Sequence, residues 1–140
     1  FIRESLETAT VRYAVKNCNT DLAEKLSMLI EQQKQCVKDD NRLRLSELDD
    51  LFHRTIVEFQ FSRRVWKIIN NAKAQMDRVR ILALPLPRRA IEIVEEHSII
   101  YEALCSGNET QAVEAMTFHL NTVFTSLEQL LEKHHEYFEE

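Results

Sequence analysis

The chain of 140 residues is long enough for one domain with a hydrophobic core and too short for two comfortable ones. It contains one Gly and two Pro, and this scarcity of turn residues disfavours a fold of many short strands and favours long helices. The net charge of −5 offers no basic surface to nucleic acid, and no apolar run approaches the roughly 20 residues that cross a bilayer.

The cysteines and the first residue bear on the setting of the chain. Cys18, Cys36 and Cys105 are odd in number and widely spaced, which argues against a disulfide framework and favours a reducing, cytoplasmic location. The chain opens on Phe1 with neither an initiator Met nor a signal-peptide pattern. This start suggests a piece of a longer protein.

Hydrophobic residues recur at spacings of three and four along almost the whole chain, which predicts about six helices. The first is expected over residues 2–17. The segment NCNTD, residues 17–21, ends it and supplies capping groups for the second helix, which runs to about residue 37. The segment KDDN, residues 38–41, marks the next joint.

The third helix carries an apolar stripe from Leu45 to Phe59, and Ser62 is expected to cap the fourth. The fourth helix ends near PLP, residues 85–87, because proline removes a donor and disfavours helix before it. The fifth is expected over roughly residues 88–106.

Two residues mark the loop between the fifth and sixth helices. Gly107 stands where a left-handed C-terminal cap is wanted, and Asn108, followed three residues later by Gln111, resembles a capping box for a long sixth helix. Helices joined by such short loops imply an all-α antiparallel bundle, a single domain over residues 1–140.

Three of the five histidines lie on or beside these apolar stripes. His97 stands within the stripe of the fifth helix, His119 within that of the sixth, and His53 at the edge of the third. His134 and His135 belong to the charged tail instead. Burying an unpaired imidazole is costly, so each inward ring needs a partner.

A divalent metal is one partner that all three rings can share. Asp49 precedes His53 by four residues, so both lie on one helix face, and Asp49, His53, His97 and His119 form a three-histidine, one-carboxylate set with an open position. Zinc is the first choice, while nickel and manganese accept the same ligands. The alternative is three separate core histidines, each bonded to a backbone carbonyl or a nearby Glu. The set as a whole favours the metal.

Several segments resemble the FCD domain, the C-terminal effector-binding domain of FadR-branch GntR-type bacterial transcription regulators. The opening IRESLETATVRYAV is similar to the family's first helix at Arg3, Leu6 and Glu7. LDDLFH, residues 48–53, and EHSIIYEALCSGNETQAVEAMTFHL, residues 96–120, are similar to its later motifs. The spacing of the four candidate ligands suits the metal-binding subgroup.

This resemblance implies a sensor and not an enzyme. A metal in the bundle would bind a small carboxylate effector, and the response would pass to a winged helix-turn-helix domain that precedes this one and is absent from the chain. Arg3 and Arg78 coincide with positions where the family often carries arginine, so they are expected to bind the effector. The family also implies a cytoplasmic homodimer that contacts DNA only through the absent domain.

Two alternatives stay open. Three histidines on a metal also describe a metal-dependent hydrolase, although the chain has no HExxH motif to supply a general base. The other alternative is a structural helical adaptor without a ligand.

Overall fold

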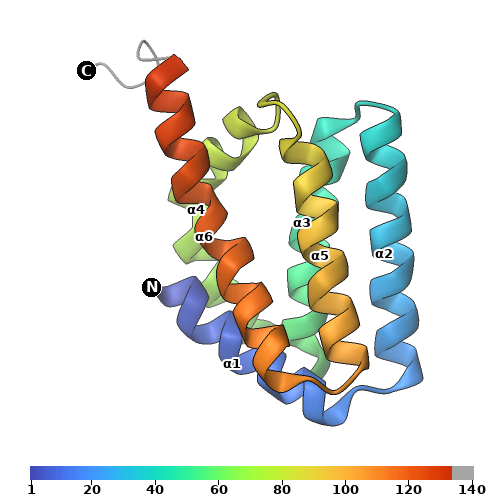
Figure 1. Cartoon of the computed structure of the whole chain (residues 1–140). Coiled ribbons are helices and arrows are strands. Elements are labelled where there is room, and N and C mark those ends of the chain that lie inside the picture. The colour runs from blue at the N-terminus through green and yellow to red at the C-terminus, as the bar shows by residue number, and fades with distance from the viewer. Residues whose placement is uncertain (134–140) are drawn as a thin grey trace.

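The computed structural model describes residues 1–133, without the side chains of Gln75 and Lys133, and the predicted all-α bundle is confirmed. His134 and His135 lie outside the described residues. Consecutive helices after the first run antiparallel (Figure 1). The helices of the described residues are α1 (Ile2–Asn17), α2 (Thr20–Lys38), α3 (Arg42–Gln60), α4 (Arg63–Ala83), α5 (Arg89–Cys105) and α6 (Glu109–Lys133).

Asparagine side chains start three of the helices. Asn19, Asn41 and Asn108 each accept a hydrogen bond from the backbone N–H three residues later, at 2.9, 3.1 and 3.1 Å. Gly107 adopts φ +74° ahead of α6, as its predicted capping position requires. Ser62 precedes α4 as expected, but its side chain makes no capping hydrogen bond.

The helices pack around one interior. α2 packs against both α3 and α5, while α6 packs against α5, α1 and α4. Figure 1 shows α1 crossing beside the lower part of α6, so the start of the chain lies close to its last helix. The main hydrophobic core takes residues from α1, α2, α3, α5 and α6. Among the described residues, no helix is both long and apolar enough to cross a membrane.

Candidate metal centre

Asp49, His53, His97 and His119 meet in the interior of the bundle. One ligand atom from each lies within 4.8 Å of every other, and all four side chains are buried. Asp49 and His53 occupy one face of α3, while α5 and α6 supply one histidine each. The structure therefore brings together all four residues that the sequence analysis proposed as ligands.

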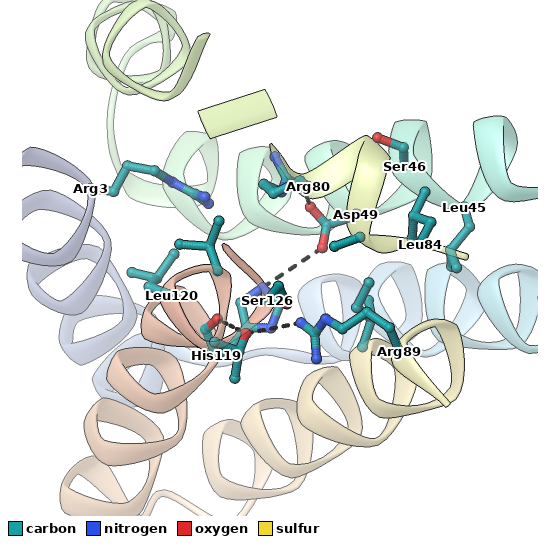
Figure 2. Close-up of a pocket in the computed structure, with 14 residues that line it drawn as sticks. Arg3, Leu45, Ser46, Asp49, Arg80, Leu84, Arg89, His119, Leu120 and Ser126 are labelled. Atoms are coloured by element: carbon teal, nitrogen blue, oxygen red, sulfur yellow. Dashed lines mark hydrogen bonds and ion pairs between the residues drawn. The ribbon is translucent and has the colours of Figure 1, made fainter. Parts of the chain in front are cut away.

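The meeting atoms are the Nε2 atoms of the histidines and Oδ1 of Asp49. The Nε2 atoms of His53 and His119 lie 2.9 Å apart. Asp49 Oδ1 lies 3.4 Å from His97 Nε2 and 3.7 Å from His119 Nε2, the second contact being drawn in Figure 2. The rings of His97 and Phe52 stack with centroids 4.1 Å apart, which fixes the plane of that imidazole.

Each Nδ1 atom contacts a residue that the sequence analysis did not propose as a ligand. Glu7 Oε2 lies 2.5 Å from Nδ1 of His53, and Glu96 Oε2 lies 2.5 Å from Nδ1 of His119. Gln33 Oε1 lies 2.9 Å from the third Nδ1, that of His97. A hydrogen-bond acceptor facing Nδ1 favours the tautomer that is protonated at Nδ1. The lone pair of each Nε2 atom is then available on the side that faces the cluster.

Glu7 and Glu96 fall within the segments that resemble the family, while the hydrophobic pattern itself marks Gln33. It interrupts the apolar face of α2 and is fully buried. A buried amide needs partners, and Gln33 finds them by donating to the Leu48 carbonyl at 3.1 Å and by accepting from His97. Glu7 and Glu96 stand beside many other acidic residues in the sequence, so their spacing alone does not single them out.

The Nε2 atoms of His53 and His119 lie within hydrogen-bonding distance of each other. Two nitrogen lone pairs repel at 2.9 Å, so this separation requires either a proton on one Nε2 atom or a cation shared by both. Burial, followed by the charges of His97 and His53, lowers the pKa of His119 well below 6.5, which favours the neutral ring that binds a metal. His53 faces the Glu7 carboxylate through Nδ1.

These residues fit a divalent cation. His97 Nε2 is buried and has no hydrogen-bond partner among the described residues, which is the condition of a nitrogen awaiting a ligand. Because Zn–N bonds are about 2.0–2.1 Å long, two nitrogens 2.9 Å apart can both reach one ion. Imidazole and carboxylate are ordinary ligands of zinc, nickel and manganese. The cluster can hold a metal ion, and its composition does not select one metal.

The pKa values of the buried Glu7 and Glu96 shift in opposite directions. Burial by itself raises the pKa of Glu7, but the charges of His53 and Arg3 and hydrogen bonds from both outweigh it and lower that pKa from 4.5 to about 2. Burial raises the pKa of Glu96 despite the opposing hydrogen bond and charge of Arg89. Burial, followed by the charge of His53, lowers the pKa of His97 well below 6.5. A neutral His97 is the form that binds a metal.

A cavity with a volume of about 30 Å³ opens beside Asp49 and His119. Three arginines line it, Arg3, Arg80 and Arg89. Figure 2 shows Arg3 and Arg89 reaching toward its centre from opposite sides. A cavity of this size accommodates a small polar group such as a carboxylate.

The sequence analysis selected Arg3 and Arg78, and the structure places them differently. Arg3 lines the cavity, whereas the side chain of Arg78 is exposed on α4 and does not line it. Arg80, one half-turn further on, pairs with Asp49 Oδ2. Burial, followed by the charge of Arg3, lowers the pKa of Arg80 from 12.5 to about 10, which still leaves it charged at neutral pH.

Fold and site together define a helical-bundle domain with a buried histidine and carboxylate cluster beneath an arginine-lined cavity. The sequence model of the FCD domain matches residues 1–122, and the chain belongs to this family, as its motifs predicted. It is 27% identical over 140 residues to the HTH-type transcriptional repressor RspR of Escherichia coli (strain K12), an alignment that covers 100% of this chain and 61% of that protein.

A second relative comes from Streptomyces ambofaciens. The chain is 31% identical over 83 residues to the "Uncharacterized HTH-type transcriptional regulator in unstable DNA locus", which covers 59% of this chain and 35% of that protein. The chain thus spans 61% of the length of RspR, the first of these regulators.

Proposed function

We propose that this domain is the effector-sensing part of a transcription regulator, in which a divalent metal held by Asp49, His53, His97 and His119 binds a small organic acid. The observation that carries the proposal is the convergence of three Nε2 atoms and one carboxylate oxygen beside a cavity lined by three arginines. A bound divalent ion supplies a Lewis-acidic position for a carboxylate oxygen. Zinc is the preferred ion, with nickel and manganese as alternatives.

Arg3 is suited to hold the effector carboxylate. Its Nε donates to Glu7 Oε1 at 2.7 Å, and neither Nη atom has a hydrogen-bond partner among the described residues. The side chain is only 15% exposed, so these two groups face the cavity with little competition from solvent. Two parallel N–H groups match the two oxygens of a carboxylate. A role for Arg78 in effector binding stays a prediction that the cavity lining does not support.

The relatives support the regulatory setting. They are HTH-type transcriptional regulators, and the proposal places the response in a separate helix-turn-helix domain that alone contacts DNA. A cytoplasmic location and a homodimer belong to the same proposal, because regulators that read two-fold symmetric operators are themselves two-fold symmetric.

The hydrolase alternative requires a general base that faces the open side of the metal. Apart from the proposed ligand Asp49, the buried carboxylates that contact the histidines are Glu7 and Glu96, and both lie against Nδ1 atoms on the far side of the rings. Neither is placed to take a proton from a water in the cavity. The sensor is therefore preferred over the hydrolase.

Metal analysis of the untagged protein tests the proposal. We expect about one ion per chain in the wild type and a loss of metal in Ala variants of each of the four ligands. A wild type without stoichiometric metal would overturn it. For the effector, a thermal-shift screen of small carboxylates on zinc-loaded protein should find ligands whose effect is lost in Arg3→Met. Arg12→Met, an exposed arginine on the same helix, is the matched control.

A further inference from the structure

Two chains of side chains connect the cavity to the metal ligands from behind. In the first, Arg3 Nε donates to Glu7 Oε1 at 2.7 Å, and Glu7 Oε2 lies 2.5 Å from His53 Nδ1. In the second, the two Nη atoms of Arg89 donate to Glu96, the shorter bond being 2.7 Å. Glu96 Oε2 then lies 2.5 Å from His119 Nδ1. We call these the two Arg–Glu–His chains.

Both chains are buried at the carboxylate and reach the cavity at the arginine. Glu7 is 1% exposed and Glu96 7%, so neither has water as an alternative partner. Arg3 and Arg89 line the cavity that is proposed to take the effector. The guanidinium of each chain thus contacts a glutamate that lies against a histidine of the metal site. The same guanidinium also lines the cavity proposed to hold an anion.

The third histidine, His97, has a different kind of partner at Nδ1. His97 faces the neutral amide of Gln33, and that amide donates to a backbone carbonyl instead of meeting an arginine. Two of the three imidazoles therefore contact a glutamate whose arginine partner lines the cavity. The third imidazole, that of His97, has no such connection to the cavity.

We propose that Glu7 and Glu96 are positioning residues of the metal centre, and that Arg3 and Arg89 act through them, so that an anion in the cavity raises the metal affinity along the two chains. This inference rests on the proposed function, because it concerns the regulation of the same centre. A carboxylate that accepts from Nδ1 fixes the tautomer and makes Nε2 a stronger ligand. An arginine bonded to that carboxylate withdraws part of this effect by neutralising its charge.

An anion in the cavity shares the guanidinium with the glutamate. The glutamate then carries more of its charge toward the imidazole, and the histidine binds a cation more tightly. Thermodynamic reciprocity requires that the metal raise the affinity for the anion by the same factor. Effector and metal thus bind cooperatively through residues that contact both sites.

Zinc affinity, measured by chelator competition, tests the role of Glu96. We expect Glu96→Leu to bind zinc roughly 10–100-fold more weakly than the wild type. Glu96→Gln keeps an acceptor at Nδ1 and should recover part of that loss. Glu92→Gln is the control, because Glu92 contacts the same arginine at 3.5 Å and is 43% exposed, with no histidine contact. Its zinc affinity should equal that of the wild type.

The coupling itself is measured with acetate as the anion probe. Acetate should raise the zinc affinity of the wild type, and the factor should shrink in Glu96→Gln, where the chain has lost its charge. Arg89→Met should raise the zinc affinity of the otherwise wild-type protein, because Arg89 neutralises part of the charge of Glu96. The same substitution should add no further change in Glu96→Gln, because Arg89 acts through Glu96. An acetate effect of the same size in both proteins would mean that acetate acts only by binding the metal directly, and would overturn the coupling.

Ring ¹⁵N NMR of the metal-free protein supplies a readout that does not depend on zinc. His119 should be protonated at Nδ1 in the wild type and in Glu96→Gln, and should lose this tautomer preference in Glu96→Leu. If the wild type binds no zinc, the proposed function fails and this inference with it. If the wild type binds zinc and Glu96→Leu binds it equally well with an unchanged tautomer, only this inference fails.

Discussion

The guanidinium of Arg80 on α4 pairs with the outer oxygen of Asp49 on α3, so the one carboxylate of the cluster is held from the side away from the histidines. Arg80 also donates to Asp77 at 2.8 Å and to Asp50 at 3.2 Å. The buried ammonium of Lys73 bonds these same two aspartates. The network ties α4 to the histidine and carboxylate cluster through Arg80.

Replacement of Arg80 by Met should therefore destabilise the fold. Asp49 Oδ2 would stay buried without its cation, and losing one partner of a buried pair costs about 3 kcal/mol in the free energy of unfolding. Urea denaturation of the metal-free protein measures this loss. Arg78→Met is the matched control, since its exposed side chain lies on the same helix and its removal should change the unfolding free energy by less than about 0.5 kcal/mol.

Chelation should lower the melting temperature of the metal-loaded protein. The ligands come from three helices, so a metal binds the folded chain alone and stabilises it by about 2.7 kcal/mol at a free concentration of roughly 100 Kd. For a domain of this size the loss corresponds to roughly 5–10 °C. Scans with and without EDTA give the difference, and re-addition of zinc should restore it. His119→Ala should show no response to EDTA.

Metal uptake should compete with protons at the three imidazoles, because only neutral imidazole binds a metal. The Nε2 atoms of His53 and His119 lie only 2.9 Å apart, so a cation held by both excludes a proton from either nitrogen. Isothermal titration in buffers of different ionisation enthalpy counts the released protons. Heats that do not depend on the buffer would contradict this competition. For the same reason, metal affinity should fall as the pH falls.

The metal-free protein should lose stability in mild acid. His97 and His119 have pKa values well below 6.5 in the fold, so they bind protons only after unfolding in the range below about pH 6.5. The contribution of these two histidines to the free energy of unfolding is fully present above that pH. It is lost as the pH falls toward their pKa values in the folded protein. The slope approaches 1.4 kcal/mol per pH unit for each histidine.

Denaturation at a series of pH values measures this slope. Glu96, whose pKa is raised, acts in the opposite direction above pH 4.5, and the contribution of Glu7 is lost only between pH 4.5 and about 2. The histidine range is therefore separate from that of Glu7. His97→Gln should show a shallower slope between pH 6.5 and 5, and a wild-type profile that is flat there would contradict the assignment.

The helices and their ends were predictable because their signals are local. Apolar spacing of three and four marks a helical face, and Asn19, Gly107 and Asn108 act on the backbone within a few residues of themselves. The candidate ligands were predictable for a related reason, since His97 and His119 interrupt stripes that must face the core. Ser62 shows the limit, because a suitable residue in the right place makes no capping bond.

The sequence by itself determined the six-helix bundle and the four residues whose side chains meet within it. Only the tertiary structure decided what stands behind those residues: Glu7, Gln33 and Glu96 at the Nδ1 atoms, and Arg80 in place of Arg78 beside the cavity. The physical reason is that a helical pattern specifies which face turns inward. The partner across the interface depends on how far each helix is shifted and rotated against its neighbours, which the packing of all of them sets together.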